Sequence, residues 1–197
     1  MKKKTLFLAV MVIGITMAAS GTLAYFTAED TAHNVITSGG VNIEVVEKTK
    51  GDNDVLVDFP EEGIRGVMPG SVVSKIVQVK NTGVSEAWIR VEVESTITNA
   101  DGEKLPLIIG DDNASVTNYT ILDGWLDGGD GYYYYARPVA ADAFTGALFK
   151  EVIFNSAMGN EYQNCTANIM ISAQAVQTAN NGATVMEAEG WPADTGI

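Results

Sequence analysis

The sequence predicts an all-β domain, an antiparallel two-sheet sandwich of the jelly-roll or immunoglobulin-like type. Apolar and polar residues alternate with a period of two in several short runs, as expected for strands that bury one face. Clusters of Gly, Asn, Asp and Pro separate these runs and are typical of turns. Strands with one apolar face need a second layer to cover it, so two packed sheets are expected.

Residues 1–25 have the three-part layout of a secretory signal peptide. Lysines at 2–4 precede an apolar run at 6–19, and small residues follow at 20–24. The apolar run is about 14 residues long, whereas a membrane-spanning helix needs roughly 20. We therefore expect export with cleavage, and a permanent membrane anchor is the weaker alternative.

Cleavage is expected at the end of this segment. Thr22 and Ala24 supply the small side chains that a signal peptidase requires. The cut is therefore placed directly after Ala24 or one or two residues later, beside Tyr25 or Phe26.

The mature chain is expected to have three parts. Residues 26–40 form an N-terminal arm, whose apolar Val35 and Ile36 lie among Thr, Asn and Ser, a composition that suits an extended strand. The sandwich domain is expected at 41–178, and a C-terminal tail follows at 179–197.

The clearest strand of the domain is 88–94. Ile89, Val91 and Val93 share one face of it, and the charged residues between them share the other. Further strands are predicted at 41–45, 55–59, 72–80, 119–125, 132–137, 149–154 and 169–176. The segment 140–148 fits neither pattern and leaves a helical turn open.

Charge and cysteine content exclude several classes of protein. The formal charge of −13 becomes −16 when the lysines at 2–4 are removed, and such a surface repels nucleic acid and anionic lipid headgroups. No nucleic-acid partner is therefore expected.

Cys165 is the single cysteine, so an internal disulfide is excluded. A small buried side chain is expected there, with an intermolecular disulfide as the alternative.

Several motifs occur in the order found in one known family. The stretch 21–26 reads G-T-x-A-Y-F, and 34–43 reads N-x-x-x-x-G-x-V-x-I. Further motifs are P-G at 69–70, V-x-N-T-G at 79–83, R-V at 90–91, Y-Y-Y-Y at 132–135 and T-x-x-L-F at 145–149. Together they resemble the TasA/camelysin family of Firmicutes, whose precursors go to a dedicated signal peptidase. Family members are cut just before the Phe, so the resemblance implies Phe26 as the mature N-terminus.

The residues for enzymatic chemistry are sparse. Camelysin-type relatives have been classed as metallopeptidases, so the resemblance raises a zinc site as one alternative. A zinc hydrolase needs about three clustered His, Asp or Glu ligands and a general base. The chain has one histidine, His33, and no H-E-x-x-H motif. We therefore assign no catalytic residue and expect no enzymatic activity.

Calcium is the one metal ion for which the sequence offers candidate ligands. Asn99, Asp101 and Glu103 alternate along the chain, as the oxygen ligands of a calcium loop do. A solvated turn without a metal is the other interpretation. No other cofactor is expected.

Four consecutive tyrosines, 132–135, suggest either packing or binding. In a strand, Tyr132 and Tyr134 face one side, and Tyr133 and Tyr135 the other. We expect one pair in the sandwich core and the other on the outer face. Contact with carbohydrate or with a neighbouring subunit is the alternative.

The resemblance implies a secreted structural protein of the extracellular biofilm matrix or the cell surface. Removal of the signal peptide would free the arm, and each arm would add a strand to the sheet of the next subunit, which builds a fibre. The expected partners are further copies of the chain, other matrix proteins and the signal peptidase. The alternatives are a non-assembling secreted or cell-surface binding module and, with least support, a camelysin-like metallopeptidase.

Overall fold

The computed structural model describes residues 26–29, 32–33, 40–60, 64–110 and 113–192. The strands in these ranges confirm the prediction of an all-β sandwich built mainly of antiparallel sheets. The helical elements of the described residues are three short 3-10 turns: η1 (Asp52–Asp54), η2 (Asn160–Tyr162) and η3 (Val185–Glu187). The predicted signal peptide at 1–25, with Ala24 and Tyr25, lies outside the described residues, as do Val35 and Ile36 of the arm.

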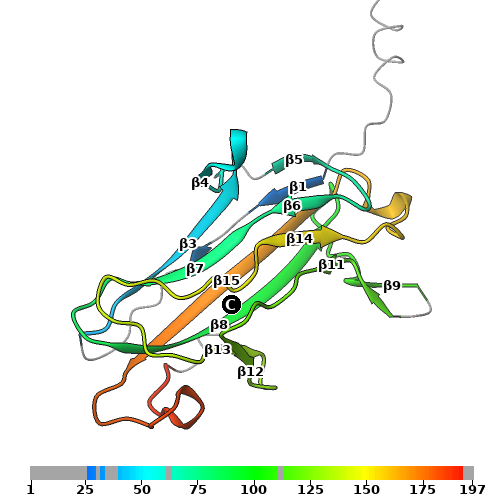
Figure 1. Ribbon diagram of the computed structural model, residues 1–197. Coiled ribbons are helices and arrows are strands. Elements are labelled where there is room, and N and C mark those ends of the chain that lie inside the picture. Colours follow the sequence, from blue (N-terminus) through cyan, green and yellow to red (C-terminus); the bar gives the residue numbers. More distant parts are fainter. Residues whose placement is uncertain (1–25, 30–31, 34–39, 61–63, 111–112, 193–197) are drawn as a thin grey trace, which may run out of the picture.

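The first layer is a seven-stranded sheet in the order β12-β13-β8-β15-β1-β5, with β2 also paired to β15. Its strands are β12 (Trp125–Asp127), β13 (Tyr132–Tyr135), β8 (Ala87–Thr98), β15 (Thr166–Gln177), β1 (Phe26–Glu29), β2 (Ala32–His33) and β5 (Ile64–Val67). The two longest, β8 and β15, pair antiparallel along all 12 positions. In Figure 1 they cross the molecule as adjacent green and orange strands.

The second layer consists of two three-stranded sheets that continue into one another. One has the order β4-β3-β7 and the other β11-β14-β6. The strands are β3 (Ile43–Lys50), β4 (Leu56–Asp58), β6 (Val72–Ser74), β7 (Ile76–Asn81), β11 (Thr117–Asn118) and β14 (Glu151–Phe154). A small hairpin of β9 (Ile108–Ile109) and β10 (Ala114–Ser115) forms a separate sheet.

The junction of these two sheets is at Lys75, which divides the predicted strand 72–80 into β6 and β7. The backbone N–H of Lys75 donates to Lys150 O at 3.0 Å, and that of Val77 donates to Phe149 O at 3.3 Å. The segment before β14 therefore continues alongside β7. Both sheets belong to one layer because these bonds bridge the interruption.

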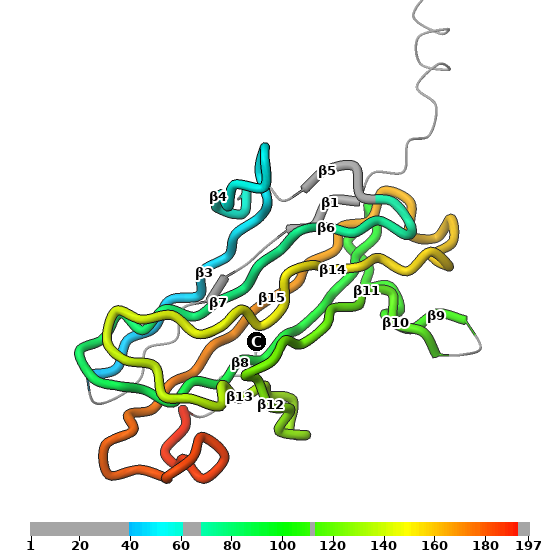
Figure 2. Tube along the Cα trace, viewed as in Figure 1, coloured from blue at the N-terminus to red at the C-terminus, as the bar shows by residue number. Residues whose placement is uncertain are grey.

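The core lies between the two layers, which Figure 2 shows running side by side along the length of the molecule. Ile89 and Val91 of β8 and Ile171 of β15 are fully buried and face Val77 and Val79 of β7 in one apolar cluster. The alternation predicted for 88–94 thus buries the expected face. Each such side chain contributes roughly 1.5–3 kcal/mol of transfer free energy.

Besides the division of strand 72–80, two sequence expectations differ from the structure. The predicted strand 119–125 is wrong: β11 ends at Asn118, and β12 begins only at Trp125. The chain crosses from the second layer to the first here, so it turns, with Gly124 at φ +97°. The segment 140–148 contains no helix; a turn with Asp142 at φ +60° leads to a stretch hydrogen-bonded to β7.

The V-x-N-T-G motif closes one end of β7 through a buried side chain. The Asn81 side chain donates to Ser85 O at 2.8 Å and to Val139 O at 2.9 Å, and it accepts from Gly83 N at 3.0 Å. A Cβ at Gly83 would lie 2.6 Å from the backbone nitrogen of Asn42. The hydrogen bonds at position 81 need a side-chain amide, and position 83 has no room for a side chain.

A buried ion pair closes the other end of β7. Lys75 Nζ lies 2.9 Å from Glu47 Oε1, both side chains are at most 6% exposed, and the ammonium sits 4.3 Å from the centroid of the Phe59 ring. Desolvation of two charges is costly and is offset only while both partners are present.

We predict that Lys75→Met alone lowers the free energy of unfolding by about 3–5 kcal/mol, because it leaves the carboxylate of Glu47 buried without its partner. The double variant Lys75→Met/Glu47→Leu should recover most of this loss, since no buried charge remains. Urea unfolding of the wild type, both single variants and the double variant measures the coupling. Additive losses in the double variant would contradict the assignment.

Candidate functional site: the second edge of β15

The two edges of β15 are covered in different ways. One edge pairs with β8 throughout. Within the described residues, the other edge pairs only with the N-terminal segment. Strand β1 lies parallel to β15 with Thr27 opposite Thr166 and Glu29 opposite Asn168, and β2 continues the contact opposite Ile171 and Ser172. The structure thus places the described part of the predicted arm on the sheet of its own chain.

Strand β1 is an internal strand of this sheet. Its other edge pairs antiparallel with β5, where Phe26 lies opposite Val67 and Ala28 opposite Ile64. Figure 1 shows β1 between β5 and β15. In the described part of the chain, β1 is the only strand paired with β5. Loss of β1 would therefore leave backbone donors and acceptors of two strands without partners.

The ladder of this segment is short. It comprises the pairs from Thr27 to Glu29 and the two from Ala32 to His33. A backbone hydrogen bond contributes only about 0.5–1.5 kcal/mol net, so β1 and β2 are held far less strongly than β8, which pairs along all 12 residues of β15. The same backbone hydrogen bonds can form whether the strand comes from the same chain or from another copy.

The calcium candidates Asn99, Asp101 and Glu103 are brought together in the turn that follows β8. Asn99 Oδ1 accepts hydrogen bonds from the backbone N–H of Asp101 at 3.0 Å and of Glu103 at 2.9 Å, and Asn99 Nδ2 donates to Glu103 Oε2 at 3.0 Å. In the described ranges, no group of three or more His, Cys, Asp or Glu could hold a metal ion. These bonds account for the turn, and calcium binding there stays a prediction.

Cys165 precedes β15 and is 1% exposed, as expected for a small buried side chain. Burial raises the pKa of its thiol, which disfavours the reactive thiolate. A disulfide to a second chain would require this buried side chain to become accessible.

A polar and aromatic cluster on the outer face of β15 was not anticipated from the sequence. Arg90 Nε and Nη2 donate to Gln174 Oε1 at 2.9 and 2.7 Å. The guanidinium lies 3.9 Å from the centroid of the Tyr132 ring and 4.8 Å from that of Trp191. Such cation–π contacts contribute about 0.5–2 kcal/mol each. They attach residues 179–192, expected as a tail, to the main sheet.

The tyrosine repeat divides between the two faces as the alternation predicts. Tyr132 and Tyr134 belong to the outer cluster, together with Trp88, Val176, Val185, Ala188 and Trp191. Tyr133 and Tyr135 pack against the main core. The Tyr134 hydroxyl donates to Asp130 Oδ2 at 2.6 Å, and this hydrogen bond holds the pKa of Asp130 below its ordinary value. The alternation was visible in the sequence, whereas the contact with Trp191 was not.

Comparison with known proteins adds no relative: no protein-family model, curated protein or solved structure matches the chain. Within the described residues, none of the helices has the length and apolar character needed to cross a bilayer.

We predict that Asp130→Asn lowers stability at neutral pH and that its difference from the wild type shrinks in acid. The pKa of Asp130 is lowered in the folded state, so the carboxylate stabilises the fold above its unfolded-state pKa, and this contribution is lost as the pH falls through the lowered value. Urea unfolding at a series of pH values measures the difference. Asp123→Asn, at an exposed carboxyl before β12, serves as the control; an identical pH profile for both variants would refute the role of Asp130.

Proposed function

We propose that the chain is a secreted structural protein of an extracellular matrix and that its subunits join into fibres by exchanging the N-terminal strand. The observation that carries this proposal is the pairing of β15: its second edge is satisfied, within the described residues, by β1 and β2 alone. A segment that pairs in this way can leave its own sheet and occupy the same edge of a neighbour, with the same hydrogen bonds formed.

The geometry favours an open chain of subunits. Strand β1 of one copy would fill the edge of β15 in the next, while its own β15 receives the segment of a third copy. The donated surface and the accepting surface differ, so the contact is heterologous. Such a contact can add subunits without limit and builds an open fibre. In this exchange, β1 and β2 would lie on one subunit and β3 (Ile43–Lys50) on the other.

Signal-peptide cleavage would control this exchange. The resemblance to the TasA/camelysin family implies Phe26 as the mature N-terminus, and residues 26–29 form β1. In the precursor, the signal peptide would still precede Phe26 and would hold this segment at the membrane. Cleavage releases the end of the strand outside the cell, where other copies and further matrix proteins are available.

We predict that a disulfide between β1 and β15 of the same chain blocks fibre formation without unfolding the domain. Thr27 and Thr166 are opposite one another in the parallel ladder, so Thr27→Cys/Thr166→Cys, made with Cys165→Ser, fixes the segment on its own sheet. The oxidised mature protein should stay monomeric in sedimentation and form no fibres in negative-stain microscopy. Reduction should restore both assembly and fibres.

The single variant Cys165→Ser is the matched control and should form fibres under both conditions. Fibres of normal yield from the oxidised, intramolecularly cross-linked monomer would reject strand exchange. Absence of fibres from the wild type and from Cys165→Ser, at every concentration and pH tried, would instead favour the non-assembling binding module.

A further inference from the structure

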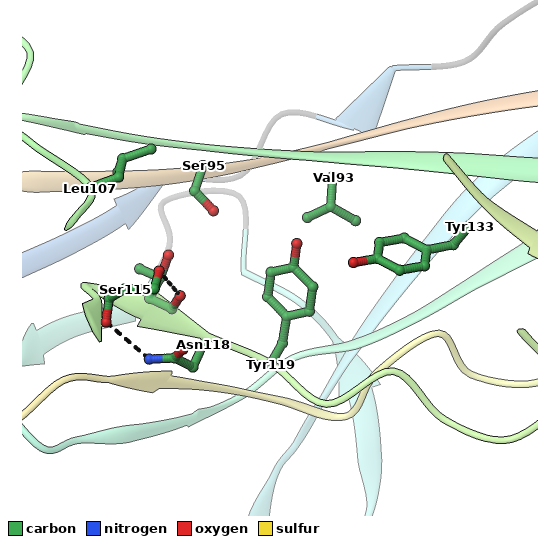
Figure 3. A pocket seen from close by; sticks show the side chains of 8 residues that line it. Val93, Ser95, Leu107, Ser115, Asn118, Tyr119 and Tyr133 are labelled. Carbon is green, nitrogen blue, oxygen red and sulfur yellow. Dashed lines mark hydrogen bonds between the residues drawn. The ribbon is translucent and has the colours of Figure 1, made fainter. Parts of the chain in front are cut away.

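A cavity of about 330 Å³ opens at the side of the sandwich, next to the β9–β10 hairpin. Its wall is made by the inner face of β8, by β13 and by the chain around β10 and β11, as Figure 3 shows. The lining residues are Val93, Ser95, Leu107, Ser115, Thr117, Asn118, Tyr119 and Tyr133. This volume is near the lower limit of small-molecule sites in proteins, which begin at about 300 Å³.

The lining is polar and uncharged. Apart from Val93 and Leu107, every lining residue carries a hydroxyl or an amide. The chain as a whole contains 25 Asp and Glu, and none of those that the structure describes lines this cavity. A charged ligand would lose its hydration without gaining a counter-charge, so the chemistry of the wall selects a neutral molecule with many hydroxyl groups.

Two tyrosines give the cavity a fixed shape. The ring of Tyr119 stacks on Phe149 with the centroids 4.9 Å apart, and Tyr133 is held in β13 opposite Val91. Their hydroxyls point toward one another across the cavity beside Val93 (Figure 3). Burial, followed by the charge and the hydrogen bond of Tyr133, raises the pKa of Tyr119 to about 12, so this hydroxyl is protonated at physiological pH and already interacts with that of Tyr133.

We propose that this cavity binds a single ring of a neutral carbohydrate. Hydroxyls from Ser95, Tyr119 and Tyr133 on separate elements can meet the hydroxyls of a pyranose, while Val93 and Leu107 offer apolar contact to its C–H faces. Asn118 is exposed, and the cavity is open to solvent, so the rest of a polysaccharide can extend outward. This activity is independent of strand exchange and would give a matrix subunit a direct contact with neutral glycans.

Saturation-transfer NMR on the mature chain tests the inference with glucose, galactose and N-acetylglucosamine as probes and glucuronate as the charged comparison. At least one neutral sugar should receive saturation, and glucuronate should receive less. Tyr119→Phe, which keeps the ring and its stacking on Phe149, should weaken binding about fivefold through loss of one hydrogen bond. Ser95→Leu, which fills the cavity, should abolish binding.

Tyr135→Phe is the matched control, because Tyr135 lies on β13 with Tyr133 but packs on Trp125, with the ring centroids 5.1 Å apart. It should bind the sugar as the wild type does. Absence of transfer to all three neutral sugars would overturn the inference, as would equal binding of glucuronate. Binding that survives both Tyr119→Phe and Ser95→Leu would do the same. Should Ser95→Leu fail to fold, the comparison of Tyr119→Phe with Tyr135→Phe decides alone.

Discussion

The fold depends on hydrogen-bonding both edges of β15. Strand β8 pairs with one edge along its full length, and within the described residues β1 and β2 pair with part of the other. A buried backbone group without a partner costs about 1–3 kcal/mol, so the N-terminal segment is an integral part of the main sheet. The same requirement supports the proposed assembly, because a backbone edge that must be filled accepts an identical segment from any copy.

The second layer is fixed by polar groups in its interior. At one end of β7, Asn81 binds two loops through its amide; at the other, Lys75 and Glu47 form an ion pair beneath Phe59. Apolar alternation alone is compatible with a shift of the strand pairing by two residues. The polar contacts select one register at the cost of desolvation.

Charge is distributed unevenly over the molecule. Among the described residues, no Asp or Glu lines the cavity of Tyr119 and Tyr133. The cation of Arg90 is held between the rings of Tyr132 and Trp191. A strongly acidic surface disfavours non-specific association between copies of the chain. The proposed strand exchange at β15 uses backbone hydrogen bonds, and the proposed sugar site is uncharged. Neither interaction therefore requires a partner of opposite charge.

The sequence by itself determined the all-β class, the buried face of β8 and the division of the tyrosines between two faces, because side-chain alternation is a local property of extended backbone. The tertiary structure decided where strands stop: residues 119–124 have strand-like composition but cross between layers, and Lys75 interrupts a strand where the hydrogen-bond partner changes. It also decided which strand pairs with the second edge of β15 and that the Trp191 ring packs on the Arg90 guanidinium. Such contacts join residues about a hundred or more positions apart, and they follow from the packing of the whole chain, which no local pattern encodes.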